Sequence, residues 1–307
     1  MCGIVALFNP NENVATSIYD GLIQLQHRGQ DAAGISTLNE NKMHLHKDTG
    51  LVTEVFKSDK SKLNLIGNLG IGHVRYPTAG SNDVNDSQPF YTSNPVNITL
   101  AHNGTLTNSE SIRKNLLKTH FCQFNTNSDS EALMHLFAYE LYKTNFRKLN
   151  TSHVFRALKS IYEKCSGGFS VVALVSGIGI VAFRDPNGIR PLSLGTKNKS
   201  YMIASESSAL TALDFKTVED INPGEAFILN EIGENDYPVI HEGKHAGLIG
   251  IGGLVLARIP EEILKSRAEY FRKITQDRTD AIDRDLMKEQ HPDMPINIDR
   301  QSRVTFG

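Results

Sequence analysis

The chain opens with Met1-Cys2-Gly3-Ile4-Val5-Ala6-Leu7-Phe8, in which a cysteine directly follows the initiator methionine. Removal of Met1 would leave a first residue that carries both a thiol nucleophile and a free amine. The amine titrates near ~8 and can act as a general base, whereas the thiol titrates near ~8.5 and reacts as the thiolate. A nucleophile that carries its own base is a known catalytic design, with N-terminal threonine as the parallel case. Taken alone, the stretch fits an ordinary buried strand better, and only the rest of the chain favours a nucleophile.

Composition places the chain among globular proteins of a reduced compartment. It has 307 residues, a net charge of -2 and 39% hydrophobic residues, which suits one large domain or two. The balanced charge gives no footprint for nucleic acid or an anionic membrane. No signal peptide is expected, and the longest later apolar run, 248–257, is far shorter than the ~20 residues of a membrane span. The three cysteines (Cys2, Cys122, Cys165) lie far apart without a disulfide or zinc pattern, which favours a cytoplasmic location.

The order of the predicted elements indicates an α+β fold. Strands are predicted at 2–8, 70–75, 97–102, 169–175, 179–184, 201–205 and 225–229. Helices are predicted at 17–27, 108–117, 128–141 and 151–162. Helices layered on antiparallel strands, rather than alternating β-α-β units, are typical of this class.

Three local signals refine these predictions. Gly29 and Gly34 are expected to bracket a turn before the next strand. Thr107 is the expected N-cap of the helix at 108–117. The run Ser128-Asp129-Ser130-Glu131 has the chemistry of a capping box, so Asp129 has a purely structural interpretation as part of a helix cap.

After about Tyr237, the sequence gives weaker signals for regular secondary structure. Residues 248–257 are glycine-rich and apolar without the spacing of a dinucleotide loop, which favours a core or linker strand. Residues 260–288 are charged and predicted to be helical, and 291–307 contain little apolar material and are expected to be disordered. We therefore expect a folded domain at 2–237 and a divergent or truncated, partly helical segment at 238–307.

Six short polar motifs punctuate the first two-thirds of the chain. Singly each is weak, because an Asn-Gly pair is usually a turn and a lone arginine is usually a solvated charge. The motifs are Gln26-His27-Arg28-Gly29-Gln30-Asp31, Gly72-His73-Val74-Arg75-Tyr76-Pro77-Thr78-Ala79-Gly80, Ser87-Gln88-Pro89-Phe90, Ala101-His102-Asn103-Gly104, Ser128-Asp129-Ser130-Glu131 and the block at 184–192, Arg-Asp-Pro-Asn-Gly-Ile-Arg-Pro-Leu.

In this order behind Cys2, the motifs resemble the glutaminase domain of the amidophosphoribosyltransferases. That domain is a class II glutamine amidotransferase of the N-terminal-nucleophile hydrolase superfamily. The resemblance runs from Cys2 to about Gly224; the forms at 75–80, 88–90 and 184–192 point to the purine enzyme in particular. It implies an αββα sandwich, in which two antiparallel sheets lie between layers of helices.

The resemblance also implies catalytic roles. Cys2 would attack the side-chain amide of glutamine, release ammonia and leave a γ-glutamyl thioester, with its own amine moving the protons. The side-chain amide of Asn103 and the backbone N–H of Gly104 are the implied donors to the tetrahedral oxyanion. The histidines of the motifs (His27, His73, His102) are expected to be structural, since this chemistry requires no imidazole.

Four further residues are implied to bind or position the substrate. Arg75 is the expected partner of the glutamine carboxylate, because its planar fork can hold a carboxylate through two bonds. Thr78 would add a hydroxyl contact, and Asp129 would bind the ammonium group in addition to any capping role. Arg28 lies in the loop that the family places beside the nucleophile. It is expected either to position that loop or to lower the thiol pKa, and the sequence does not separate the two.

Members of the family also carry a phosphoribosyltransferase half that binds phosphoribosyl pyrophosphate, and nothing after Tyr237 resembles it. The chain is therefore expected to supply the glutaminase half of the first committed step of purine synthesis and not to make phosphoribosylamine alone. No cofactor is expected for this half: magnesium would belong to the missing half. No iron–sulfur cluster is predicted because no cysteine follows Cys165. L-Glutamine is the expected substrate, and a phosphoribosyltransferase partner or a homo-oligomer is left open.

Two other interpretations stay open at this stage. The chain could be a stand-alone class II glutamine amidotransferase that feeds another synthase, although the block at 184–192 argues against it. It could also be a non-catalytic regulatory remnant, against which the intact Cys2, Asn103 and Asp129 argue, because a decayed site would lose its nucleophile freely.

Overall fold

The structure is a computed structural model that describes residues 1–57, 64–76, 84–119 and 121–229. It also gives the backbone of short strands within 250–304. It divides the chain into two compact units, Met1–Pro260 and Glu261–Gly307. In the second unit, β15 (Ile298–Asp299) pairs antiparallel with β16 (Arg303–Val304). The helix predicted over 260–288 lies outside the described residues, as does most of the segment predicted to be disordered.

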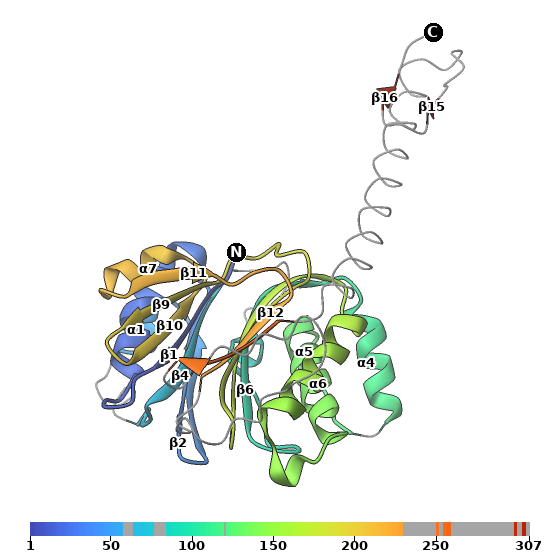
Figure 1. The fold of residues 1–307 in the computed structure, drawn as a ribbon, viewed down its shortest axis with the longest axis horizontal. Helices are drawn as coiled ribbons and strands as arrows, with labels where there is room; N and C mark the ends of the chain where they lie inside the picture. The colour runs from blue at the N-terminus through green and yellow to red at the C-terminus, as the bar shows by residue number, and fades with distance from the viewer. Residues whose placement is uncertain are drawn as a thin grey trace. The chain divides into compact units, whose positions relative to one another are not determined.

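The first unit is built on two seven-stranded antiparallel sheets, which Figure 1 shows face to face. One sheet has the order β11-β9-β10-β1-β4-β2-β3 and the other has the order β13-β14-β12-β8-β7-β6-β5. The strands of the first sheet are β1 (Gly3–Phe8), β2 (Ala32–Asn39), β3 (Lys42–Thr49), β4 (Leu69–Arg75), β9 (Ser193–Lys197), β10 (Ser200–Ala204) and β11 (Lys216–Asp220). Those of the second are β5 (Phe90–Thr92), β6 (Ile98–Leu106), β7 (Gly167–Val175), β8 (Gly179–Arg184), β12 (Glu225–Leu229), β13 (Gly250–Ile251) and β14 (Leu254–Arg258).

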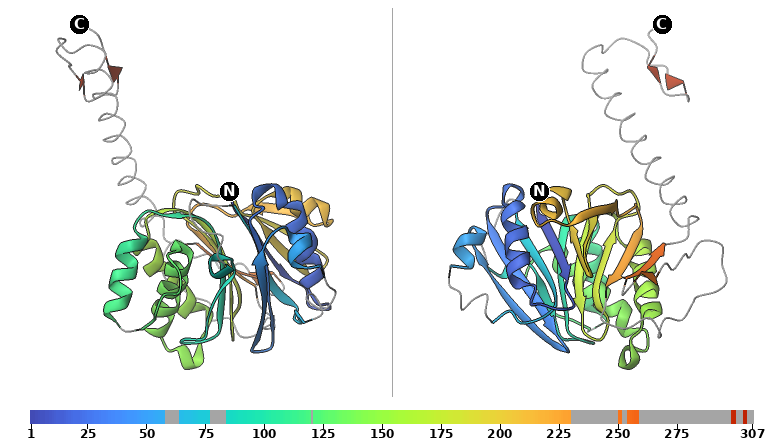
Figure 2. Two further views of the ribbon diagram at one scale, coloured as in Figure 1. Left: turned by 180° about the vertical axis from the view of Figure 1, so that it is seen from behind. Right: turned by 60° about the vertical axis from the view of Figure 1, so that its left-hand side comes forward.

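Helices cover the outer faces of both sheets, as Figures 1 and 2 show. The first sheet carries α1 (Ala15–Gln24), α2 (Val52–Val55) and α7 (Ser207–Ala212). On the second sheet, α5 (Asp129–Tyr142) packs on β5 and β6, and α4 (Ser109–Lys118) and α6 (Thr151–Lys164) pack on α5. The predicted α+β class and the αββα sandwich are confirmed.

The central strand β1 is buried on both faces because its side chains alternate between two apolar clusters. Ile4, Ala6 and Phe8 join the cluster between the two sheets. Val5 and Leu7 face the other way and join the cluster under α1. Side chains two residues apart on a strand share a face, so this alternation fixes the direction of every side chain along β1.

The described strands of the first unit that follow the predicted boundary at 237, β13 and β14, belong to the second sheet. There β14 pairs with β12 over its whole length, from Glu225 with Arg258 to Leu229 with Leu254. The first unit therefore runs to Pro260, because this pairing adds a strand at the edge of the sheet. The expected core or linker strand within 248–257 corresponds to β13 and most of β14.

Three local predictions are wrong. Gly34 lies inside β2, opposite His73, and not in a turn; a Cβ there would lie 2.2 Å from the backbone oxygen of Gln88, so glycine permits a close backbone approach. The N-cap of α4 is Asn108, one residue after the predicted Thr107. At α5, Ser128 accepts from the Ser130 N–H, but the Glu131 carboxylate accepts from the preceding loop, so no capping box forms.

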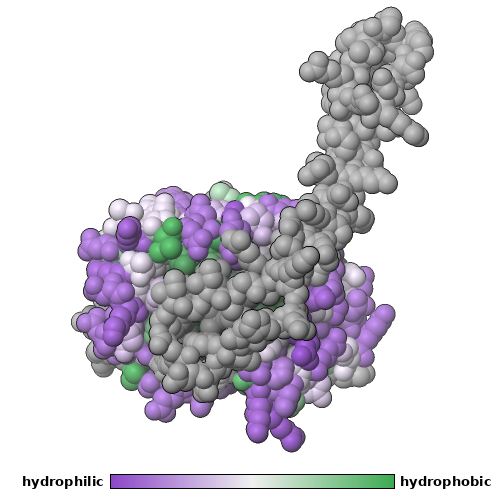
Figure 3. Space-filling model, in the orientation of Figure 1, coloured by the Kyte–Doolittle hydropathy of each residue, from purple (hydrophilic) through white to green (hydrophobic). Residues whose placement is uncertain are grey.

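The described surface in Figure 3 is largely hydrophilic, with small apolar areas between polar ones. Large apolar side chains are mostly buried instead, many of them in the two clusters on either side of the first sheet. Within the described part of the chain, no helix combines the length and the apolar character that crossing a membrane requires.

Candidate active site

The start of the chain lies at one end of the sandwich, where β1 enters the first sheet between β10 and β4 (Figure 1). Two hydrogen bonds hold this entry: the Ile4 N–H donates to the Ser205 Oγ at 3.0 Å, and the Ser205 N–H donates to the Ile4 carbonyl at 3.0 Å. Cys2 stands two residues before Ile4, in the phase of β1 that faces the second sheet. The fold therefore presents Cys2 at the end of the inter-sheet core.

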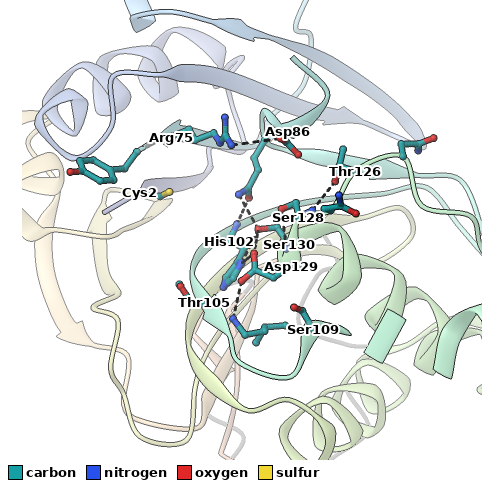
Figure 4. Close-up of a pocket in the computed structure, with 16 residues that line it drawn as sticks. Cys2, Arg75, Asp86, His102, Thr105, Ser109, Thr126, Ser128, Asp129 and Ser130 are labelled. Carbon is teal, nitrogen blue, oxygen red and sulfur yellow. Dashed lines mark hydrogen bonds and ion pairs between the residues drawn. The ribbon is translucent and has the colours of Figure 1, made fainter. Parts of the chain in front are cut away.

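Cys2 opens onto a cavity of about 670 Å³, shown in Figure 4. Four of the predicted site residues line it together: Cys2, Arg75, Gly104 and Asp129. Cys2 directly precedes β1, and the others belong to β4, β6 and α5, segments that are far apart in the sequence. The remaining wall includes Asp86, His102, Ser130 and the loop that precedes α5, residues 125–128.

Asn103, unlike its neighbours His102 and Gly104, is not among the residues that line the cavity. Ala101, two residues earlier on the same face of β6, belongs to the apolar cluster between the sheets. The side chain of Asn103 therefore also lies on the side of β6 that faces the first sheet. Asn103 is only 1% exposed, and its Nδ2 has no hydrogen-bond partner among the described residues. An unpaired buried donor costs about 1–3 kcal/mol, so such a group calls for a functional explanation.

Gly104 is required by the packing of β6 against β7. Its φ is +157°, and a Cβ at this position would lie 2.1 Å from the Gly168 backbone oxygen. Any side chain would therefore push the two strands apart. The backbone at Gly104 borders the cavity without a side chain in front of it, which suits an N–H donor to a substrate.

Two carboxylates orient the guanidinium of Arg75. Its Nη1 donates to Asp31 Oδ2 at 2.8 Å, and its Nη2 lies 3.8 Å from Asp86 Oδ2. Arg75 is 8% exposed, so the pairing takes place out of bulk water, where the attraction between charges is stronger. Neither acidic partner was singled out from the sequence, because both lie in other segments of the chain.

Asp129 connects the end of β6 to the start of α5. Its Oδ2 accepts from the Leu106 N–H at 2.8 Å, and it stands in the first turn of the helix, where the helix dipole stabilises an anion. Its side chain keeps 25% exposure and borders the cavity. The structure therefore gives this carboxylate a role at the helix end and leaves it accessible to a ligand.

A buried polar network lies beside Asp129. Gln88 Oε1 accepts from the His102 N–H at 2.7 Å, and Gln88 Nε2 donates to Ser130 Oγ at 3.0 Å. The Nδ1 of His102 lies 2.9 Å from the same hydroxyl. Burial lowers the pKa of His102, against the opposing charge of Asp129, so the ring is neutral at physiological pH. Ser130 was missed as a site residue because the sequence suggested only a helix cap.

Arg28 contacts Cys2 through the backbone. Its Nε donates to the Cys2 carbonyl at 3.0 Å, and its Nη1 forms an ion pair with Glu206. Of the two roles expected for Arg28, the geometry favours positioning. Glu206 was not singled out from the sequence.

Burial favours a protonated Cys2 thiol in the resting protein. Burial raises the pKa of the Cys2 thiol, while a hydrogen bond from the Tyr76 backbone, the terminal amine and Arg75 lower it in part. Burial lowers the pKa of the terminal amine, which in the structure belongs to Met1, and the cations Arg28 and Arg190 lower it further. An amine with a lowered pKa is a ready acceptor for a thiol proton at neutral pH.

One predicted site residue, Thr78, lies outside the described residues. No group of three or more His, Cys, Asp or Glu side chains within the described segments could hold a metal ion.

Comparisons with known proteins agree with this geometry. Residues 73–212 match the family described as the glutamine amidotransferase domain. The chain is 48% identical to the amidophosphoribosyltransferase of Pseudomonas aeruginosa over 238 residues, which cover 76% of this chain and 47% of the relative. The Escherichia coli enzyme is 48% identical over 240 residues, again 76% of this chain and 47% of the relative.

A solved structure shows the same fold. The glutamine phosphoribosylpyrophosphate amidotransferase of B. subtilis, complexed with ADP and GMP, superposes with a TM-score of 0.65 at 31% identity. The match covers 75% of this chain and 47% of that chain. The chain thus spans about half the length of the curated relatives it matches.

The fold and the site together define a glutamine amidotransferase domain of the N-terminal-nucleophile hydrolase fold. Within that class, the chain is similar to the amidophosphoribosyltransferases, and the match covers about half of each of these relatives, consistent with their glutaminase half.

Proposed function

We propose that the chain is a glutaminase that hydrolyses the side-chain amide of L-glutamine to glutamate and ammonia. The observation that carries the proposal is the convergence of Cys2, Arg75, Gly104 and Asp129 on one cavity. Hydrolysis of this substrate needs a nucleophile, an accessible backbone N–H as a hydrogen-bond donor, and one cation and one anion to bind the amino-acid end. The chain brings them together from four separate segments.

The reaction begins when Met1 is removed and the amine passes to Cys2. That amine takes the thiol proton, and the sulfur attacks the amide carbon of glutamine. The oxyanion that forms accepts hydrogen bonds from Asn103 Nδ2 and the Gly104 N–H. The carbon–nitrogen bond then breaks, the protonated amine returns its proton to the leaving ammonia, and a γ-glutamyl thioester remains. Water attacks the thioester carbon and releases glutamate and the free thiol.

The substrate is held at its amino-acid end by opposite charges. Arg75 binds the α-carboxylate, since its guanidinium is already oriented by Asp31 and Asp86. Asp129 binds the α-ammonium group, and Thr78 contributes a hydroxyl. With the amino-acid end fixed, only a side chain of the right length places its amide carbon over the sulfur of Cys2.

The ammonia is destined for phosphoribosyl pyrophosphate, in the first committed step of purine synthesis. This acceptor is inferred from the amidophosphoribosyltransferases that the chain resembles. The phosphoribosyltransferase part is supplied by residues other than those described here. The glutaminase step needs no cofactor, because the nucleophile and its base belong to one residue, and the reaction takes place in the cytoplasm.

The proposal is tested with the purified chain and glutamine. Ammonia and glutamate should appear in equal amounts, and the intact mass should correspond to loss of Met1. Asparagine is the matched control substrate: it is one methylene shorter, so its rate should be lower by about 10–200-fold. A protein that retains Met1 and releases no ammonia would overturn the proposal, and so would equal rates with the two amides.

A further inference from the structure

Glu206 connects two basic residues at the corner between β10 and α7. Its carboxylate forms an ion pair with Arg28 Nη1 and lies 3.2 Å from His27 Nε2. Arg28 is buried, with 7% exposure of its side chain, whereas Glu206 keeps 29% and His27 keeps 59%. The buried partner of Glu206 is therefore Arg28, and His27 is a peripheral one.

The guanidinium of Arg28 has a second contact, with the nucleophile itself. Its Nε donates to the Cys2 carbonyl at 3.0 Å, so Cys2, Arg28 and Glu206 form a continuous chain of polar contacts. The residue before Glu206 holds the next part of β1, since Ser205 exchanges two hydrogen bonds with Ile4. One corner of the fold thus fixes both the first strand and the residue that precedes it.

We infer that Glu206 is a positioning residue for the N-terminal nucleophile: its carboxylate fixes Arg28, and Arg28 holds the Cys2 carbonyl. The inference rests on the proposed glutaminase function, in which the amine and the thiol of Cys2 both react. A first residue has no preceding peptide to restrain it, and chain termini are poorly ordered unless they are tied down. The carbonyl of Cys2 is the group by which the fold can restrain it.

The charge of Glu206 has a second consequence. In the structure the terminal amine belongs to Met1; burial lowers its pKa, the Cys2 thiolate opposes this, and the cations Arg28 and Arg190 lower it further. Arg75 and Asp129 act on the thiol itself. The pKa of Glu206 is lowered: burial raises it, but the bonds from Arg28 and His27 outweigh burial, so the carboxylate is charged at neutral pH. Glu206 therefore offsets part of the charge that Arg28 presents to the amine.

The experiment measures the rate of ammonia release against pH for the full chain from which Met1 has been removed. In Glu206→Gln the shape of the side chain is kept but its charge is lost. The uncompensated Arg28 should lower the amine pKa, so the acid limb of kcat should move to lower pH. Glu206→Ala also loses the anchor, and kcat should fall by about 10–100-fold with little change in KM, because a small displacement of a reacting group is costly.

Two variants separate positioning from general stabilisation. Glu206→Asp keeps the charge on a shorter side chain, so its acid limb should coincide with that of the wild type while kcat falls. If Glu206→Gln does not fold, Glu206→Asp still tests whether the position of the carboxylate determines kcat. His27→Gln removes the other partner of the same carboxylate and should change neither kcat nor the pH profile. Wild-type kcat and pH profile in folded Glu206→Gln would overturn the inference, and so would an equal loss of kcat in His27→Gln.

A readout that does not need glutamine turnover keeps this inference distinct from the proposed function. Iodoacetamide alkylates cysteine thiolates, and peptide mass spectrometry follows Cys2 apart from Cys122 and Cys165. The pH dependence of Cys2 alkylation should shift in Glu206→Gln and not in His27→Gln. If the wild-type protein releases no ammonia but the alkylation profile of Glu206→Gln is still shifted from that of the wild type, the proposed function is overturned and the inference is supported. An unshifted profile would overturn the inference whatever the glutaminase rate.

Discussion

Asn103 carries a donor that the folded protein leaves without a hydrogen-bond partner among the described residues. The side chain is buried, and its Nδ2 lies on the side of β6 that faces the start of β1. Burying this donor without a partner costs free energy in the resting protein. The donor is therefore available to bind the tetrahedral oxyanion, which exists only during the reaction. Its bond then stabilises the transition state and not the bound substrate.

Substitution of Asn103 by the isosteric aspartate, or by alanine, removes this donor. We expect kcat for ammonia release to fall by about 10²–10³-fold, with KM for glutamine nearly unchanged. The measurement is steady-state kinetics together with Tm, to verify folding. An increase in KM at constant kcat would contradict the role, because it would assign Asn103 to substrate binding.

His73 is buried in the sheet, and neither ring nitrogen has a hydrogen-bond partner among the described residues. Burial and the neighbouring His102 lower its pKa to about 3. The unfolded chain takes up a proton on this residue at about pH 6.5, whereas the folded chain does not until much lower pH. The contribution of His73 is therefore complete above pH 6.5 and is lost as the pH falls from 6.5 towards 3.

This titration predicts the slope of stability against pH. In the wild type, His73 alone should reduce the free energy of unfolding by about 1.4 kcal/mol for each pH unit below 6.5. A His73→Asn variant has no such titration, so its stability should fall less steeply between pH 6.5 and 5. Urea unfolding at several pH values measures both slopes. Parallel slopes would contradict the buried neutral state of His73.

Several site residues predicted from the sequence belong to short motifs at the ends of strands. Cys2, Arg75 and Gly104 are such residues, and the structure places all three on one cavity. The residues that orient them were not predicted. Asp31, directly before the neighbouring strand β2, contacts Arg75 from 44 positions away, and Glu206 contacts Arg28 from 178 positions away, so neither contact has a local spacing that a sequence could reveal.

At the scale of elements, the loop before α5 forms much of the cavity wall and is held by one carboxylate. Glu131, 2% exposed, accepts from the Asn125 N–H, the Thr126 N–H and the Thr126 hydroxyl, each at 2.8 Å. Arg113 completes the arrangement by donating to the Thr126 and Ser128 carbonyls. Burial raises the pKa of Glu131, but these bonds and His135 outweigh burial and lower it to about 2, so the carboxylate stays charged.

A Glu131→Gln substitution should therefore weaken glutamine binding more than chemistry. The amide has one acceptor oxygen and no charge, so the loop loses at least one bond, and hydrogen bonds to charged groups contribute about 1.5–3 kcal/mol. We expect KM to rise about tenfold, equivalent to about 1.4 kcal/mol, while kcat stays within a factor of about two.

Glu140 offers a matched control on the same helix. It is 6% exposed and pairs with Lys143 and Lys164, and it does not line the cavity. Glu140→Gln should lower Tm without raising KM. A similar KM increase in both variants would show that the effect comes from a destabilised helix and not from the loop at 125–128.

Buried strands are predicted more accurately from the sequence than edge strands. The strand predicted at 179–184 is observed as β8 with the same bounds, and the strand at 225–229 as β12, because each consists mainly of an apolar run with one charged residue at one end. The strand β3 was not predicted, since Lys42–Thr49 is rich in charged and histidine residues. It is an edge strand whose position is fixed only by its pairing with β2.

At the scale of the whole molecule, the site depends on two sheets meeting at one end. The proposed nucleophile directly precedes β1 of the first sheet, and the proposed oxyanion donors belong to the second sheet; the apolar cluster between the sheets sets their separation. No single element could assemble this site. The extension of the first unit to Pro260 could not be predicted, because the glycine-rich residues before β14 give no clear strand signal.

The limited match to the relatives gives a prediction for the whole chain. With glutamine and phosphoribosyl pyrophosphate together, the 307-residue protein should form glutamate and ammonia in equal amounts and should not consume the phosphoribosyl pyrophosphate. Pyrophosphate release, measured in parallel with glutamate, tests this. Glutamine-dependent release of pyrophosphate would contradict it and would place an acceptor site within these residues.

The central claim, that Cys2 is the nucleophile, is tested most directly by the rate of ammonia release in a Cys2→Ser variant from which Met1 has been removed. Serine keeps the amine, the size and the fold, but its hydroxyl is a far weaker nucleophile at neutral pH. The rate should fall by more than ~10³-fold, as for the removal of other catalytic nucleophiles. A folded Cys2→Ser protein that releases ammonia at the wild-type rate would contradict the account.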